Sequence, residues 1–72
     1  MKENDIIGLI DMIYDGINST EYNCKSLKEI ENDIVPKCIN NFNISDYLAK
    51  YIAKTIYSSK QNLKYINYGF QQ

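Results

Sequence analysis

Apolar residues recur every three or four positions along most of this 72-residue chain, and this spacing places them on one face of an α-helix. No segment alternates apolar and polar residues as a half-buried strand does, and no internal repeat is visible. The spacing therefore predicts an all-α fold, and a chain this short has room for a single domain, residues 1–72. The first stretch with this spacing consists of Ile6, Leu9, Ile10, Ile13 and Ile17, with Ile7 and Tyr14 at its edge.

Polar residues mark where the first helix begins and ends. Asn4 or Asp5 can cap its start, because a short polar side chain accepts hydrogen bonds from free backbone N–H groups. The segment 16–20 contains glycine, asparagine, serine and threonine, which usually end a helix. We therefore expect the first helix over about residues 5–17.

The second helix begins with a capping box. In the segment 26–29 the hydroxyl of Ser26 can accept from the backbone N–H of Glu29, while the glutamate side chain reaches back to the serine N–H. Pro36 lies inside this helix and lacks a backbone N–H, so we expect a kink or a break near Val35. Because Pro36 points away from the apolar stripe, a helix bent around its core fits better than one cut in two. The stripe consists of Leu27, Ile30, Ile34, Cys38 and Phe42, flanked by Val35.

A third helix is predicted over about residues 46–59, after Ser45 as its N-cap. The polar segment 58–62 predicts a break, and the apolar spacing after it predicts a short fourth helix. The expected architecture is a small antiparallel helical bundle of three helices plus a short C-terminal fourth. The expected inner residues of the third helix are Leu48, Ile52 and Ile56, with the small Ala49, Ala53 and Thr55, and those of the fourth are Leu63, Ile66 and Phe70.

Residues suited to metal, cofactor or catalytic chemistry are sparse. The chain contains no histidine, which is the commonest general base and metal ligand. Cys24 and Cys38 alone cannot complete a tetrahedral zinc site, and the three glycines are scattered singly, unlike a phosphate-binding loop. We therefore expect no metal site, no cofactor and no enzymatic activity.

The compartment follows from the N-terminus and the cysteines. The first residues turn acidic at once and no signal-type apolar run follows them. We therefore expect a cytoplasmic protein in which both thiols stay reduced and each cysteine acts as a small buried residue. If the chain were exported, Cys24 and Cys38 could instead form one disulfide.

Charge and tyrosine content favour a binding function. Residues 1–36 hold eight acidic residues and three lysines, whereas residues 37–72 hold five lysines and one aspartate. This asymmetry can steer a partner, or it can let the two halves attract each other. Tyrosine is enriched at binding surfaces because it offers a large amphipathic area and loses little rotamer entropy.

Helical geometry groups tyrosines and lysines on the outer face of the third helix and beyond it. We predict that Tyr57 is exposed, whereas Tyr14, Tyr47 and Tyr51 could equally cover the edge of the core with only their hydroxyls in water. The predicted partner-binding residues are Tyr47, Lys50, Lys54, Tyr57, Lys60 and Lys64.

This layout resembles the immunity proteins that protect producers of pediocin-like (class IIa) bacteriocins. The resemblance rests on the amphipathic segment 6–17, the capped helix from Ser26 and the segment 47–57 with its polar break, and it covers most of the chain. It implies a small cytosolic antiparallel four-helix bundle that binds a sugar-permease receptor complex at the membrane, without catalysis, largely through its C-terminal half. The chain departs from the family in its shorter length and in Pro36. The residues that match the recognition region are Tyr57, Lys60 and Lys64.

Other partners fit the same features. A small phage- or mobile-element-encoded inhibitor of a host enzyme or defence complex would also be small, charged and free of catalytic residues. A nucleic-acid accessory protein could stack single strands on tyrosines, but this chain has no arginine and no basic total. A homodimer is a further alternative, because a second copy could cover apolar surface that so short a chain leaves open.

Overall fold

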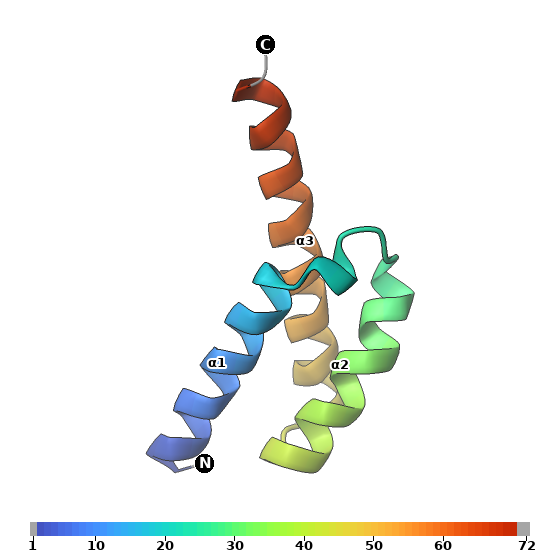
Figure 1. Ribbon diagram of the computed structural model, residues 1–72. Coiled ribbons are helices and arrows are strands. Elements are labelled where there is room, and N and C mark those ends of the chain that lie inside the picture. Colours follow the sequence, from blue (N-terminus) through green and yellow to red (C-terminus); the bar gives the residue numbers. More distant parts are fainter. Residues whose placement is uncertain (1, 71–72) are drawn as a thin grey trace.

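The computed structural model describes the backbone of residues 2–70 and the side chains of residues 2–62 (Figure 1). All regular structure in this part of the chain is helical, which confirms the predicted all-α class. Successive α-helices run in opposite directions (Figure 1). The elements are α1 (Glu3–Asn18), the 3₁₀ turn η1 (Thr20–Tyr22), α2 (Leu27–Phe42) and α3 (Asp46–Phe70).

Helix α1 begins two residues earlier than the sequence predicts, at Glu3. Lys2 is its N-cap, and the Asp5 carboxylate accepts a hydrogen bond from the Lys2 backbone N–H at 3.3 Å. Asp5 therefore satisfies the helix start from the first turn instead of from the N-cap position that we expected. Helix α1 ends at Asn18, inside the polar segment that was predicted to end it.

Helix α2 begins with the predicted capping box. The Ser26 hydroxyl accepts from the Glu29 backbone N–H at 3.2 Å, and the Glu29 carboxylate accepts from the Ser26 N–H at 3.0 Å. These bonds favour the ionised carboxylate and lower the pKa of Glu29. Pro36 lies within α2, exposed to solvent as predicted, and the helix continues past it to Phe42.

Asn43 separates α2 from α3. It adopts a left-handed conformation with φ 52° and donates its N–H to the Ile39 carbonyl at 3.1 Å, which ends α2. Ser45 then caps α3, as predicted, because its hydroxyl accepts from the Leu48 N–H at 3.1 Å.

The predicted break in residues 58–62 is wrong, because these residues continue α3. The segment contains serine, lysine, glutamine and asparagine but neither glycine nor proline, so nothing in it prevents helical backbone. The structure consequently shows three α-helices in residues 2–70, and a separate fourth helix is not shown. The side chains of the predicted fourth stripe, Leu63, Ile66 and Phe70, lie outside the described residues.

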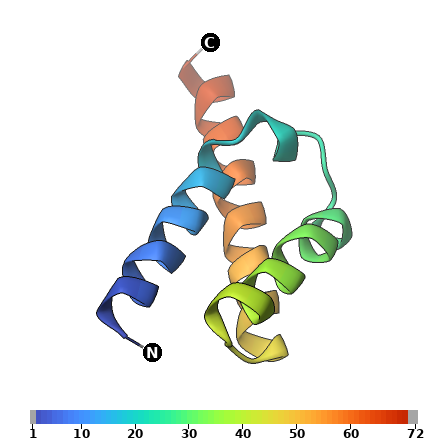
Figure 2. The ribbon, with the colours of Figure 1, turned by 60° about the horizontal axis from the view of Figure 1, so that its bottom comes forward.

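The core lies between α2 and α3, which run side by side in both views (Figures 1 and 2). The predicted stripe of α2 is confirmed, and on α3 the side chains of Ala49 and Ala53 are fully buried. Two alanines one turn apart let the helix axes approach closely. The buried core consists of Tyr22, Ile30, Ile34, Cys38, Ile44, Ala49, Ile52, Ala53 and Ile56.

Helix α1 packs against this pair near its C-terminal end and diverges from α3 towards its N-terminus (Figures 1 and 2). Gly16 is the one buried residue of α1, and a Cβ atom built on it would lie 2.9 Å from Cδ1 of Ile56. Glycine therefore sets the closest approach of α1 to α3. Four larger residues of α1 pack against the core while partly exposed, namely Leu9, Met12, Ile13 and Ile17.

Several predicted core residues are in fact exposed. Ile6 and Ile10 of α1 and Leu48 of α3 were expected on inner stripes, but solvent reaches more than a third of each. Thr55 was expected to lie against another helix and is also exposed. The spacing identified the apolar side of each helix correctly, but α1 turns Met12 and Gly16 inward, so Ile6 and Ile10 at the edge of its apolar side face solvent.

The two cysteines occupy different environments and are both free. Cys38 is buried in the core as predicted, and its burial raises the pKa of the thiol. Cys24 lies exposed after η1, so its predicted burial is wrong.

Candidate interaction surface on the third helix

Helix α3 carries an aromatic and basic surface on its outer side, and Lys50 at its edge also lines a hollow beside α2. We call this surface the tyrosine–lysine face and define it as Tyr47, Lys50, Tyr51 and Lys54. Tyr47 is 80% exposed and Tyr51 is 61% exposed, so the alternative in which these rings cover the edge of the core does not hold. The face follows from helical periodicity, because the alanines and isoleucines of α3 occupy the opposite side.

The charges of the tyrosine–lysine face are only partly neutralised within the fold. Lys50 pairs with Asp46 at 3.1 Å, and both side chains are largely exposed, so the pair contributes little to stability. Lys54 forms no ion pair with the side chains that the structure describes. The face is therefore positive and contains two tyrosine rings.

A hollow of about 310 Å³ adjoins this face along the outer side of α3. The Thr55 hydroxyl donates to the Tyr51 carbonyl at 2.9 Å and so is bound to its own helix. The hollow offers hydroxyl, amide and ammonium groups beside an aromatic ring, a composition suited to a polar protein surface. It is lined by Tyr51, Lys54, Thr55, Ser58, Ser59 and Asn62.

Two of the predicted site residues serve the fold instead. Tyr57 is half-buried and packs against the core, so the prediction that it is exposed is wrong. It follows Ala53 by one helical turn and shares the side of α3 that faces inward. Lys60 donates to the Ser19 carbonyl at 2.5 Å and to Oδ1 of Asn23 at 2.8 Å, so it neutralises the negative end of α1.

The structure thus brings together three of the six predicted residues, Tyr47, Lys50 and Lys54. Tyr57 and Lys60 lie elsewhere on α3, and the side chain of Lys64 lies outside the described residues. The sequence prediction did not include Tyr51 in the site, although its position one turn after Tyr47 was the signal that could have added it.

A second polar cluster lies where α1, η1 and α2 meet. The hydroxyl of the buried Tyr22 donates a hydrogen bond to the Asp33 carboxylate, and Lys37 forms an ion pair with the same carboxylate at 3.5 Å. The hydrogen bond from Tyr22 lowers the pKa of Asp33, while burial and then Asp33 raise the pKa of Tyr22. Lys25 lies 5.6 Å from the centre of the Tyr22 ring, within reach of a cation–π contact.

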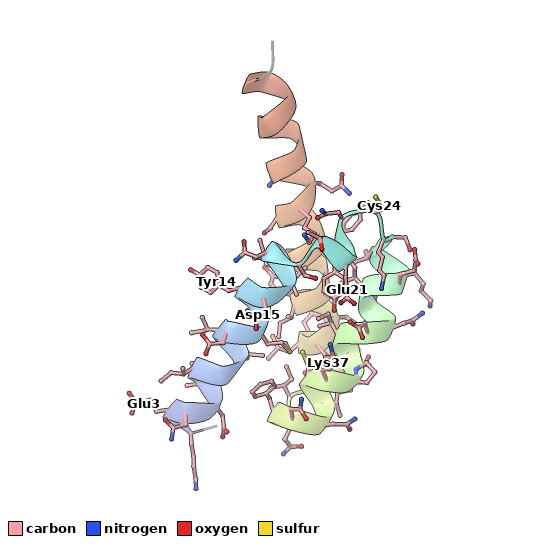
Figure 3. The ribbon with its side chains drawn as sticks, in the orientation of Figure 1. Glu3, Tyr14, Asp15, Glu21, Cys24 and Lys37 are labelled. Atoms are coloured by element: carbon pink, nitrogen blue, oxygen red, sulfur yellow. The ribbon has the colours of Figure 1, made fainter. Side chains whose placement is uncertain are left out.

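A cavity of about 240 Å³ adjoins this cluster. Asp15, Glu21 and Lys37 lie around it on one side of the molecule (Figure 3). Each buried polar side-chain atom in the described residues has a hydrogen-bond partner. The cluster therefore holds η1 against α2 without leaving a buried polar atom unsatisfied.

No group of three or more histidine, cysteine, aspartate or glutamate side chains in the described part of the chain could hold a metal ion. No helix in it is both long enough and apolar enough to cross a membrane.

The comparisons with known proteins indicate no relationship. The chain matches no protein-family model, no curated protein and no solved structure.

Proposed function

We propose that this protein is a non-catalytic module that binds another protein through the tyrosine–lysine face of α3. The observation that carries the proposal is that Tyr47 and Tyr51 are largely exposed while the fold uses neither ring. Large aromatic side chains left in water are costly, and at interfaces they supply much of the binding energy.

The charge of the face specifies the kind of partner. Lys50 and Lys54 stand beside the rings, so a complementary surface carries acidic residues around an apolar centre. The lysines steer the encounter, and burial of the two rings supplies the affinity. Such an interface lies on one rigid helix, which favours binding because little backbone must be ordered.

The decisive experiment is affinity capture from a cell lysate with matched variants. We expect the 72-residue chain to retain a stoichiometric protein, and we expect the double variant Tyr47→Ala/Tyr51→Ala to lose it. Ile39→Ala is the control, because Ile39 is an exposed apolar residue of α2 that lies outside this face. Retention of the same protein by the double variant would contradict the proposal.

The resemblance to bacteriocin immunity proteins adds a finer proposal, in which the captured protein is the membrane receptor complex engaged by a pediocin-like bacteriocin. Expression in a sensitive host is then expected to protect it, and Tyr47→Ala/Tyr51→Ala to abolish the protection. Absence of protection against every pediocin-like peptide would remove this finer proposal. Capture of a soluble host enzyme or defence complex would favour an inhibitor instead.

A further inference from the structure

Helix α1 carries an apolar surface that no side chain of residues 2–62 covers. We call it the isoleucine face and define it as Ile6, Ile7, Ile10 and Tyr14, all of them exposed. At 100° per residue these four side chains fall within an arc of roughly 100° on one side of α1. Glu3 and Tyr14 both project from the outer side of this helix (Figure 3). Soluble proteins rarely leave such a contiguous apolar surface without a use for it.

The packing of α1 makes this exposure unavoidable. A Cβ atom on Gly8 would lie 3.2 Å from the ring of Phe42, and Met12 lines the cavity beside α2, so both residues mark the side of α1 that faces α2. Ile6 and Ile10 precede them by two positions, which turns their side chains roughly 160° away. The helix therefore cannot bury both sides within one copy of the chain.

Charge distinguishes the surroundings of the two exposed faces. Residues 3–18 contain four acidic residues and no lysine, and Glu3 and Asp11 border the isoleucine face. The first part of α3, residues 46–62, contains three lysines and one aspartate. The isoleucine face is therefore an apolar surface with an acidic border, which is the chemistry proposed above for the partner of the tyrosine–lysine face.

We infer that the isoleucine face of one copy of this chain docks on the tyrosine–lysine face of a second copy, forming a two-fold symmetric dimer. This inference rests on the proposed function, since it names an occupant of the same face. In a two-fold dimer the contact occurs twice, because each copy supplies one α1 and one α3.

The alternative pairings fit less well. Two α1 helices packed on each other would bring Glu3 and Asp11 of both copies together, and like charges across an interface are repelled. Docking within one copy would require α1 to fold back on the outer side of α3, but α1 diverges from α3 towards its N-terminus (Figures 1 and 2). Docking of α1 on α3 of a second copy places acidic residues near Lys54.

The dimer has a consequence for partner binding. Because the second copy occupies the tyrosine–lysine face, it competes with any other protein that binds there. Binding of a partner is then coupled to dissociation of the dimer, and the apparent affinity for the partner falls as the protein concentration rises.

Sedimentation equilibrium of the 72-residue chain tests the inference. We expect a concentration-dependent dimer, and we expect Ile10→Lys to weaken the dimer at least about tenfold by placing a charge in the apolar contact. Ile39→Lys is the matched control, since Ile39 on α2 is 38% exposed, against 47% for Ile10, and lies outside both faces. Circular dichroism verifies that both variants remain helical.

Two outcomes would overturn the inference. One is a wild-type chain that sediments as a monomer at every accessible concentration. The other is a dimer that Ile10→Lys leaves intact or that Ile39→Lys weakens equally, because either result would put the contact elsewhere.

A charge exchange tests which helices meet. Asp11→Lys and Lys54→Glu alone are each expected to weaken the dimer, since each brings like charges together at both contacts. The double variant carries the wild-type net charge and restores an opposite pair, so we expect it to recover most of the wild-type association. A double variant as weak as the worse single variant would refute docking of α1 on α3.

The inference and the proposed function can fail separately. Ile10→Lys leaves the tyrosine–lysine face intact, so a monomeric Ile10→Lys chain is expected to capture a partner at least as well as wild type. A monomeric wild type that still captures a protein through Tyr47 and Tyr51 would overturn the dimer and retain the function. Loss of capture by Ile10→Lys, with its helices intact, would place the partner on α1 and contradict the proposed face.

Discussion

The two halves of this small fold, which are the α2–α3 pair and helix α1, bury their isoleucine side chains to different extents. Helices α2 and α3 bury Ile30, Ile34 and Ile56 almost completely, whereas α1 leaves Ile6 and Ile10 nearly half exposed. All three helices carry isoleucine at helical spacing, so the residue type does not cause the difference. The small residues at the contacts do, since they decide how closely two helices approach.

Close approach extends over different lengths in the two halves. Ala49 and Ala53 are fully buried one turn apart, so α3 stays close to α2 over that length. Helix α1 has a single comparable position, Gly16. We therefore expect the pair α2–α3 to supply most of the stability, while the first half of α1 leaves Ile6, Ile7 and Ile10 exposed.

Truncation of an isoleucine gives the largest expected contrast between the halves. Ile34→Ala leaves a cavity between α2 and α3 and is expected to lower the free energy of unfolding by about 2–5 kcal/mol. Ile10→Ala removes an exposed side chain and is expected to change it by less than about 0.5 kcal/mol. Urea denaturation at concentrations where the chain is monomeric measures both. Equal losses would show that α1 is as deeply packed as α2.

The two glycines of α1 sharpen the comparison within one helix. Gly16→Ala is expected to destabilise the fold by about 1–3 kcal/mol, because its Cβ would meet the fully buried Ile56 at 2.9 Å. At Gly8 the nearest atom belongs to the half-buried ring of Phe42, which can move, so Gly8→Ala is expected to be neutral or to stabilise by up to about 1 kcal/mol through helix propensity. Thermal unfolding of both variants measures which one is less stable. A Gly8→Ala variant less stable than Gly16→Ala would contradict the close contact at Gly16.

Two lysines of α3 are expected to differ in their effect on stability, because Lys60 bonds to the end of α1 whereas Lys54 lies on the exposed face. Lys60→Met removes the ammonium group that binds Ser19 and Asn23, and it is expected to cost about 1 kcal/mol. Lys54→Met is the control and is expected to leave stability unchanged within about 0.5 kcal/mol. Denaturation of the two variants side by side measures the difference. If both variants match the wild type, Lys60 does not hold α1 against α3.

The smallest expected effect is a pH dependence at the junction of the two halves. Tyr22 lowers the folded-state pKa of Asp33 below the ordinary range, so this carboxylate stabilises the fold at neutral pH, and the contribution is lost as pH falls through the folded pKa. Tyr22→Phe removes the largest cause of the lowered pKa and is expected to flatten the acid side of the stability profile. An unchanged acid profile in this variant would show that the Tyr22–Asp33 bond does not contribute.

Local signals in the sequence predicted much of this fold. The boxes and caps at Ser26 and Ser45 depend only on residues within one turn, and both were predicted correctly. The inner stripe of α2 was also predicted correctly, and its central residues Ile30, Ile34 and Cys38 are buried.

Features that depend on other helices could not be read from one helix alone. The rotation of α1 about its axis is set by the contacts of Gly8 and Gly16 with distant residues. The predicted inner stripe therefore wrongly included Ile6 and Ile10, which are exposed.

The candidate site shows the same contrast between local and distant contacts. The exposure of Tyr47 and Lys54 could be predicted from helical periodicity alone, whereas Lys60 bonds to residues 41 and 37 positions away in the sequence. The break in 58–62 was inferred from polarity, which does not prevent a helix.

Native-state hydrogen exchange in dilute solution, where the chain is monomeric, measures the contrast between the halves most directly. Amides of buried positions in α2 and α3, such as Ile34 and Ala53, are expected to exchange only through global unfolding, while amides near Ile10 exchange through much smaller openings. Protection near Ile10 as strong as that in α2 and α3 would contradict the claim that α2 and α3 form the core and that α1 presents a free face.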